Sequence, residues 1–386
     1  MKFLITGANG FVGKPLCAEL IRRGQVVRAA VRYAYIPGEN VEVAAVGSID
    51  GKTDWSDALR DVDVVIHLAA RVHVMHDAAD DPLAEFFKVN LNGTSNLAQQ
   101  AARAGVKRLV YASSIKVNGE QTSGEQTFAE SDTPNPQDPY AISKWRAEQD
   151  LQRISQETGI EVVILRPPLV YGPEVKGNFD RLLNAINRGI PLPLAGAKNL
   201  RSLVYVGNLV DALITCAQHP AAAGQTYFLS DGVDFSTAML AKKIARALGR
   251  NSRIFYFPPA LLRAMAAVFG RAEQVDRLFG SLRVNDEKIR KQLACLRRIH
   301  WNKACAQQQS GIAAGIYADC ADDSTSEKMR LYPCILKASN LICKHAEPTS
   351  LSDHRACVEA ILRCRATRAA TGGKDHARAY DCGDAR

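Results

Sequence analysis

The sequence predicts an α/β fold, in which a doubly wound parallel sheet is followed by a smaller C-terminal lobe. From the start of the chain to about residue 165, short β-rich runs alternate with helix-length segments. This alternation is typical of parallel sheets that helices cover on both faces. The strand candidates are nearly continuous apolar runs, as in Val64-Val65-Ile66, which indicates that both faces are buried.

Each expected element follows from a local pattern. Lys2–Thr6 is an apolar run that ends at glycines, Val12–Arg23 is amphipathic, and Asp138-Pro139 marks a helix start. The expected strands are Lys2–Thr6, Val26–Val31, Val62–Leu68, Lys107–Ser113 and Ile160–Leu165, and the expected helices are Val12–Arg23, Pro82–Ala104 and Tyr140–Glu157. Beyond residue 166 the rhythm loosens, and single short elements are expected at Ser202–Val206, Leu209–Gln218 and Thr226–Leu229. They predict a lobe on the carboxyl edge of the sheet, where open α/β sheets bind ligands.

Three parts of the chain are expected: residues 1–165, residues 166–293 with some return to the sheet, and an atypical tail at 294–386. Eight of the ten cysteines fall in the tail: Cys295, Cys305, Cys320, Cys334, Cys343, Cys357, Cys364 and Cys382. They form no CxxC pair, and the segment lacks a coherent amphipathic stretch. We therefore expect a poorly ordered tail with reduced thiols and no metal site.

Charge and hydropathy restrict the partners of the chain. The formal charge is +9, but no aromatic–basic motif accompanies it, so we expect no nucleic-acid partner. The best apolar stretch, Ala260 to Phe269, is too short to span a bilayer and is interrupted by Arg263, so we expect no membrane partner. Residues 1–6 show no secretory signal, which predicts a cytoplasmic protein.

The segment TGANGFVG at residues 6–13 predicts a dinucleotide site. Gly7, Gly10 and Gly13 allow a tight turn, a close approach of the backbone to a pyrophosphate, and close packing of the helix on the strand. The amino end of the next helix then offers N–H groups to the phosphates. An ordinary strand–turn–helix junction is the alternative. The position of the motif between an expected strand and an expected helix favours a Rossmann dinucleotide-binding domain, which we expect to comprise residues 1–165.

The end of the second expected strand indicates which dinucleotide binds. An acidic residue there would bind the ribose hydroxyls of NAD, but Val31 stands in its place. Arg32 could bind the 2′-phosphate of NADP through its planar guanidinium, although a solvated arginine also fits. NADP is therefore favoured, with NAD as the alternative, and Asp50 could contact the adenine.

Tyr140 and Lys144 place a phenol and an ammonium on one face of a helix. The cation would favour the phenolate and so lower the pKa of Tyr140. Such a tyrosine can exchange a proton with an alcohol while hydride moves to or from a nicotinamide. A YxxxK pair alone is common on solvated helix faces. Here Ser113-Ser114 also ends a strand at the edge where the ligand should lie, and the joint occurrence indicates an active site.

These motifs resemble those of extended short-chain dehydrogenases/reductases of the nucleotide-sugar epimerase/dehydratase family. TGANGFVG, HLAA, Asn90 with Gly93-Thr94, YASS, YAISK and RPPLVYGP match in order over roughly residues 1–293. The resemblance implies that Ser114, Tyr140 and Lys144 are catalytic. It also implies a UDP-sugar substrate and a homodimer.

The resemblance, together with the interpretation of Arg32 given above, provides the expected binding residues. The cofactor contacts would be Gly7, Asn9, Gly10, Phe11, Val12, Gly13, Arg32, Ile49, Asp50, Leu68, Ala69, Ala70, Tyr140, Lys144 and Pro167. The substrate contacts would be Ser114, Lys116, Asn178 and Arg201. A guanidinium such as that of Arg201 suits a diphosphate, although a plain surface arginine fits the same motif, and Lys116 could merely face solvent.

The resemblance leaves the reaction open. No acid follows Ser114 where the dehydratases of the family carry Thr-Asp-Glu, so dehydration is not expected. The first expectation is reduction of the C4 ketone of a UDP-linked 6-deoxy-hexosamine for surface polysaccharide (O-antigen, lipopolysaccharide). It rests on a similarity of residues 113–120 and 166–179 to bacterial UDP-4-keto-6-deoxy-N-acetylglucosamine reductases. The alternatives are a UDP-sugar 4-epimerase, of the UDP-glucose or UDP-N-acetylglucosamine type, and a catalytically inactive dinucleotide-binding protein.

The chain departs from the family after Leu293. Residues 282–293 resemble the late D-x-S-K-I-x-x-x-L stretch, but no Gly-Trp-x-Pro segment follows. A changed reading frame and a genuine extra segment would both explain the shift.

Overall fold

The computed structural model describes residues 1–33, 40–72, 81–270 and 272–294, so the expected tail lies outside the described residues from Cys295 onward. Its main element is a seven-stranded sheet with the order β3-β2-β1-β4-β5-β6-β9, in which every pairing is parallel. The strands are β1 (Lys2–Thr6), β2 (Val26–Val31), β3 (Val41–Ala45), β4 (Val64–His67), β5 (Arg108–Ala112), β6 (Glu161–Arg166) and β9 (Thr226–Phe228). The expected doubly wound sheet is confirmed, and the strand order reverses beside β1, where ligands of such sheets bind.

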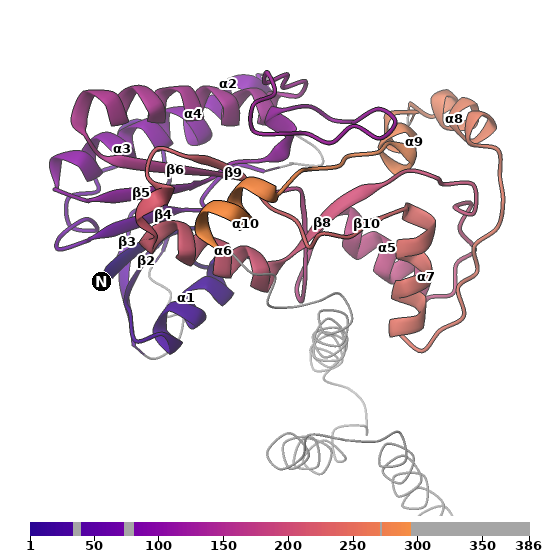
Figure 1. The fold of residues 1–386 in the computed structure, drawn as a ribbon, viewed down its shortest axis with the longest axis horizontal. Coiled ribbons are helices and arrows are strands. Elements are labelled where there is room, and N and C mark those ends of the chain that lie inside the picture. The colour runs from indigo at the N-terminus through magenta and orange to yellow at the C-terminus, as the bar shows by residue number, and fades with distance from the viewer. Residues whose placement is uncertain (34–39, 73–80, 271, 295–386) are drawn as a thin grey trace, which may run out of the picture. The chain divides into compact units, whose positions relative to one another are not determined.

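Helices cover both faces of this sheet (Figure 1). On one face lie α1 (Gly13–Arg22) and α6 (Val206–Gln218), and on the other lie α3 (Gly93–Arg103) and α4 (Pro139–Thr158). Because strand side chains alternate between faces, Phe3 and Ile5 join the core with α1 and α6, whereas Leu4 joins the core with α3 and α4.

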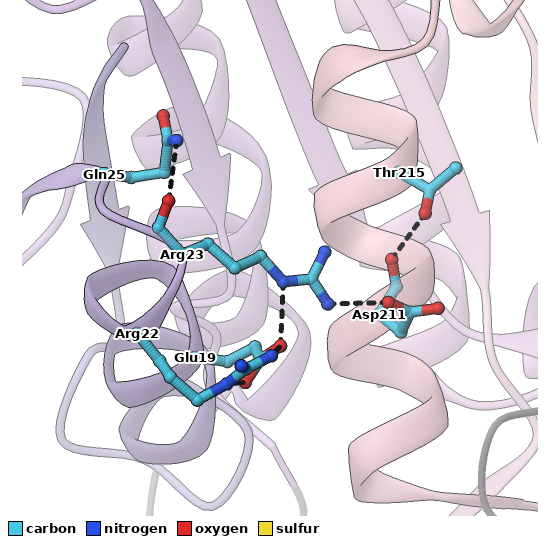
Figure 2. Close-up of polar contacts among 6 residues, drawn as sticks. All are labelled: Glu19, Arg22, Arg23, Gln25, Asp211 and Thr215. Carbon is cyan, nitrogen blue, oxygen red and sulfur yellow. Dashed lines mark hydrogen bonds and ion pairs between the residues drawn. The ribbon is translucent and has the colours of Figure 1, made fainter.

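Arg23 links the two helices of the first face. Its guanidinium donates to Glu19 at 2.7 Å within α1 and to Asp211 of α6 at 2.7 Å (Figure 2). Hydrogen bonds from Arg22, together with Arg23, hold the pKa of Glu19 at about 2. On α6, Thr215 bonds the carbonyl of Asp211 at 2.8 Å. This polar link fixes α1, the helix after the glycine loop, against α6.

The helix expected at residues 82–104 is interrupted by a wider turn. It consists of α2 (Pro82–Phe86), a π-helical segment (Phe87–Asn92) and α3. Such turns often lie at functional sites. The Asn90 side chain is buried, donates to the carbonyl of Arg71 and to Ser143 Oγ at 3.0 Å each, and accepts from Arg71 N at 2.8 Å. The turn therefore joins the segment after β4 to α4.

The smaller lobe has its own three-stranded sheet, of order β10-β8-β7. Its elements are β7 (Leu169–Tyr171), α5 (Asn178–Asn187), β8 (Arg201–Tyr205), β10 (Asp234–Phe235), α7 (Thr237–Ala247), α8 (Pro259–Val268) and α9 (Ala272–Phe279). Phe179, Leu183 and Ile244 pack its core. After α9, α10 (Glu287–Leu293) packs back against the core of the large sheet. Along the described residues, no helix has both the length and the apolar character needed to cross a bilayer.

Candidate active site

The glycine loop is packed too tightly for side chains. Gly7 has φ +68°, and a Cβ there would lie 2.9 Å from the backbone nitrogen of Ala69. A Cβ on Gly13 would lie 2.2 Å from the carbonyl oxygen of Gly7, to which Gly10 N also donates at 2.9 Å. The N-cap residue Val12 supplies no capping side chain, and the first turn of α1 has no acid. The loop and its N–H groups therefore fit the diphosphate of a dinucleotide.

Replacing Gly13 by alanine should destabilise the protein by about 1–3 kcal/mol, because the added methyl must displace backbone atoms. Gly51→Ala is the matched control, since the nearest atom to its Cβ would be 3.4 Å away and its φ is unstrained. Urea unfolding of the two variants makes the comparison. If both variants had the same free energy of unfolding, the loop would have room for a Cβ at Gly13, contrary to this geometry.

The other predicted cofactor residues lie along the same edge of the sheet. Leu68, Ala69 and Ala70 follow β4 and are half-buried, as are Phe11 and Pro167, whereas Asn9 is exposed. Ile49 and Asp50 lie after β3, where the N–H of Lys52 donates to the Asp50 carboxylate at 2.8 Å and lowers its pKa. Arg32 is exposed at the end of β2, beside residues 34–39, which are outside the described part.

Ser114, Tyr140 and Lys144 come together at the carboxyl end of β5. Asp138 caps α4 by accepting from Ala141 N at 2.7 Å, and Tyr140 therefore lies in the first turn. The side chains of Ser114 and Tyr140 are hydrogen-bonded. Lys144 is 2% exposed, and its Nζ donates to the carbonyl of Ala112 at 2.8 Å and lies 6.0 Å from the centroid of the Tyr140 ring.

The expected lowering of the Tyr140 pKa is not found. Burial first, and then the charge of Asp138, raise this pKa to about 12, against the hydrogen bond from Ser114. The ammonium of Lys144 is directed to the carbonyl of Ala112 and lies over the Tyr111 ring at 4.5 Å, so it does little for the phenolate. Burial lowers the pKa of Lys144 to about 7, and the negative charge of Glu148 opposes that effect.

A buried ionic network beneath these residues was not predicted. Glu148 lies one turn after Lys144 on α4, is 0% exposed, and accepts hydrogen bonds from Arg166 and from Ser113 Oγ. Arg166 also donates to Asn118 Oδ1 at 2.8 Å. Because Ser113 precedes Ser114 and Arg166 precedes the loop at residue 167, the network ties the ends of β5 and β6 to α4. The signal in the sequence was the four-residue spacing from Lys144.

A second buried group connects β1 with β4. His67 is 1% exposed, and its ring nitrogens lie 2.6 Å from Thr6 Oγ1 and 2.9 Å from Thr94 Oγ1. Thr6 Oγ1 also accepts from the N–H of Ala69 at 3.1 Å. Burial, with a smaller effect from the charge of Lys144, lowers the pKa of His67 to about 3. The ring is therefore neutral wherever the protein is folded near neutral pH.

His67 should make stability fall as the medium is acidified. Below about pH 6.5, the unfolded chain takes up a proton on His67 that the folded chain does not, so the free energy of unfolding decreases as pH falls toward 3. The slope contributed by this group is at most about 1.4 kcal/mol per pH unit. Chemical unfolding of wild type and His67→Asn between pH 7 and 5 should show a steeper fall in wild type; parallel lines would refute this role.

The predicted substrate residues occupy two places. Lys116 is paired with Glu120 at 2.7 Å and with Asp138 at 2.6 Å, so its charge is already balanced. Arg201 begins β8, is half-buried, and donates to the carbonyl of Arg277 on α9. Burial lowers the pKa of Arg201, against the charge of Glu120.

Three further observations concern the predicted substrate residues. Glu120 bonds Lys116 and acts electrostatically on Arg201, so it relates the Arg201 site to the helix start that carries Tyr140. Arg277 was not predicted as a neighbour of Arg201, because it lies 76 residues later in the chain. Asn178 is exposed at the first residue of α5.

A Rossmann sheet with a glycine loop after β1 and a Ser–Tyr–Lys group at the carboxyl end of β5 defines the class of short-chain dehydrogenases/reductases. Residues 3–229 match the NAD dependent epimerase/dehydratase family, and the chain is an enzyme that belongs to this family. It is 42% identical to a UDP-glucose 4-epimerase of Vibrio cholerae over 284 residues. These aligned residues cover 73% of this chain and 86% of the relative.

More distant similarities extend over the same part of the chain. A 3-beta-hydroxysteroid dehydrogenase of Mycolicibacterium neoaurum is 30% identical over 261 residues, or 65% of this chain and 71% of the relative. A solved UDP-glucose 4-epimerase with UDP-glucose, from Thermotoga maritima, superposes with a TM-score of 0.67 at 20% identity and covers 82% of this chain and 100% of that one. This structural likeness supports the fold.

Proposed function

We propose that the protein is a UDP-hexose 4-epimerase with NAD as its resident cofactor. The observation that carries the proposal is the convergence of Ser114, Tyr140 and Lys144 at the carboxyl edge of the sheet that also carries the glycine loop, in a chain 42% identical to a UDP-glucose 4-epimerase. That relative favours epimerisation over the reduction of a 4-keto sugar, which was our first expectation. The family, described as NAD-dependent, favours NAD over NADP.

The residues of the chain divide the chemistry among them. A bound nicotinamide supplies the reversible hydride acceptor for C4 of the sugar. Ser114 Oγ hydrogen-bonds O4, and Tyr140 takes the O4 proton as C4 becomes a ketone. Tyr140 returns this proton after the sugar has presented its other face, so protons balance and no cofactor is consumed.

The electrostatics of the site must favour the phenolate for this proton transfer. Burial raises the pKa of Tyr140 to about 12. The positive charge of an oxidised nicotinamide would counteract this effect. The ammonium of Lys144, which the buried carboxylate of Glu148 favours, donates to the carbonyl of Ala112 and contributes little to the phenolate. Lys144 would also hold the nicotinamide ribose. Ionisation of Tyr140 thus depends on a loaded cofactor site.

Arg201 supports a diphosphate-linked sugar as the substrate. Its guanidinium stands at the first residue of β8, next to α9, and belongs to the Lys116–Glu120 group near Tyr140. Paired N–H donors of this kind match diphosphate oxygens. We place the diphosphate there and the hexose toward Ser114.

A substrate panel tests the proposal with the purified full-length enzyme. UDP-glucose, UDP-galactose, UDP-N-acetylglucosamine and UDP-4-keto-6-deoxy-N-acetylglucosamine are each incubated with NAD, NADH or NADPH. We expect UDP-glucose and UDP-galactose to interconvert without net change in nicotinamide absorbance. Stoichiometric loss of NADPH with the keto sugar alone would establish the reductase instead, and inertness toward the whole panel would establish a non-catalytic binding protein.

A further inference from the structure

Helix α8 lies at the outer end of the smaller lobe (Figure 1). It exposes apolar side chains. Leu261 and Met265 are each 52% exposed, and Val268 and Phe269 are 81% and 77% exposed. Their spacing places them on one side of the helix. No residue of α8 is buried. Exposed apolar side chains that lie together on one face of a helix are typical of interaction sites.

The opposite side of α8 has a partner within the lobe. Arg263 forms an ion pair with Asp276 of α9 at 2.7 Å, and Leu262 and Ala266 are half-buried. The exposed stripe is therefore turned away from α9. Its occupant has to come from outside the described part of the lobe.

A basic segment leads into this helix. Residues 242–263 contain six Lys and Arg and no Asp or Glu. Lys242 and Arg246 of α7, and Arg250 and Arg253 after it, are all exposed. The aromatic side chains of the same stretch, Phe255 and Tyr256, are 44% and 69% exposed. Figure 1 draws α7 and α8 at opposite ends of the lobe, and the stretch with Arg250, Arg253 and the two aromatic residues connects them. Exposed cationic and aromatic side chains that lead into an apolar helix are a combination that binds at a membrane interface.

We propose that α8 and the segment at residues 250–257 that leads into it form a docking surface for an anionic lipid bilayer. The helix lies in the plane of the interface, with Leu261, Met265 and Val268 among the acyl chains and Arg250 and Arg253 at the headgroup phosphates. A second copy of the chain fits less well, because it would bring two positive segments together. The ten residues of α8 are too few to span the bilayer. The expectation of no membrane partner considered spanning segments only, and surface docking revises it.

The docking surface adjoins the substrate side of the protein. Helix α9, the partner of α8, carries Arg277, whose carbonyl accepts from Arg201. Binding of α8 to a bilayer would thus hold the Arg201 region close to the lipid headgroups. The docking itself requires no particular reaction, so it can fail or succeed independently of epimerase activity.

Vesicle co-sedimentation of the full-length protein tests the proposal. Wild type should sediment with phosphatidylglycerol-containing vesicles, much less with pure phosphatidylcholine vesicles, and less at high salt. Met265→Glu/Val268→Glu should reduce binding by about tenfold or more, because two charges enter the apolar interface. Arg250→Glu/Arg253→Glu should reduce it similarly. Val233→Glu is the control, since Val233 is also 52% exposed but lies before β10, and it should bind as wild type does.

Thermal unfolding without vesicles shows whether each variant folds. If the Met265→Glu/Val268→Glu variant does not fold, the Arg250→Glu/Arg253→Glu variant tests the proposal in its place. Failure of wild type to bind phosphatidylglycerol vesicles would overturn the proposal. Unchanged vesicle binding by the folded variants would also overturn the proposal. If the α8 variant kept its vesicle binding but changed the protein from a dimer to a monomer, α8 would be an interface between two copies of the chain.

Discussion

Tyr140→Phe should lower kcat for UDP-hexose epimerisation by about 10²- to 10⁴-fold, the usual contribution of a general acid–base residue. The substitution removes the hydroxyl that is hydrogen-bonded to Ser114 and leaves the ring that packs edge-on against Phe86 at 6.2 Å. Stability and cofactor binding should therefore change little. Steady-state kinetics with UDP-glucose, a fluorescence titration with NAD and a melting curve together separate these effects.

Tyr33→Phe provides the matched control for this prediction. This substitution removes the same hydroxyl, but Tyr33 is 81% exposed. The kcat of the Tyr33→Phe enzyme should therefore remain within about twofold of wild type. A Tyr140→Phe enzyme that keeps wild-type kcat would mean that the proton passes through another group. The assignment of the whole Ser–Tyr–Lys site would then fall.

Glu148→Gln should be among the most destabilising single substitutions, at about 3–5 kcal/mol. It keeps the shape of the side chain but leaves the guanidinium of Arg166, which is 4% exposed, without its counter-charge. Glu157→Gln on the same helix is the control, because its ion pair with Arg153 is about half exposed and should contribute less than about 1 kcal/mol. Urea unfolding near neutral pH measures both.

The same substitution should shift the pH dependence of activity. Lys144 loses its ammonium charge as pH rises through its pKa of about 7, and Glu148 raises that pKa. Without this carboxylate the pKa of Lys144 falls, so activity that depends on the ammonium should be lost at lower pH than in wild type.

A double Glu148→Leu/Arg166→Met variant removes both charges and should regain part of the stability that Glu148→Gln loses. Equal destabilisation by Glu148→Gln and Glu157→Gln would contradict this account of the network.

The sequence predicts the sheet well where strands are buried on both faces. The apolar runs at β1, β2, β4, β5 and β6 are each located to within a few residues, because burial on both faces forces continuous apolar side chains. Strand β3 (Val41–Ala45) was missed. It is an edge strand with half-buried and exposed residues, so its composition does not distinguish it from a loop. The π-helical turn at Asn90 was also missed, because its amphipathic pattern continues that of the flanking helices.

The site was predictable as a set of motifs and less so as an electrostatic environment. Spacing and strand ends bring Ser114 to Tyr140, but pKa values depend on contacts that no local pattern encodes. Lys144 donates to the carbonyl of Ala112, a contact that the sequence does not indicate. From the sequence Glu148 resembles a solvated helix residue, and only the structure shows its ion pair with Arg166. Lys116 is an example of the reverse. The resemblance to the family suggested a contact with the substrate, but in the structure two carboxylates neutralise its charge.

UDP-glucose carrying deuterium at C4 tests most directly whether Tyr140 and its neighbours support a hydride transfer at that carbon. The purified enzyme is incubated with this substrate, and the label in the UDP-galactose formed is located by NMR. We predict that the product retains deuterium at C4, because hydride leaves and returns without exchange with water. Loss of the label to solvent, or no UDP-galactose at all, would contradict the proposed epimerase.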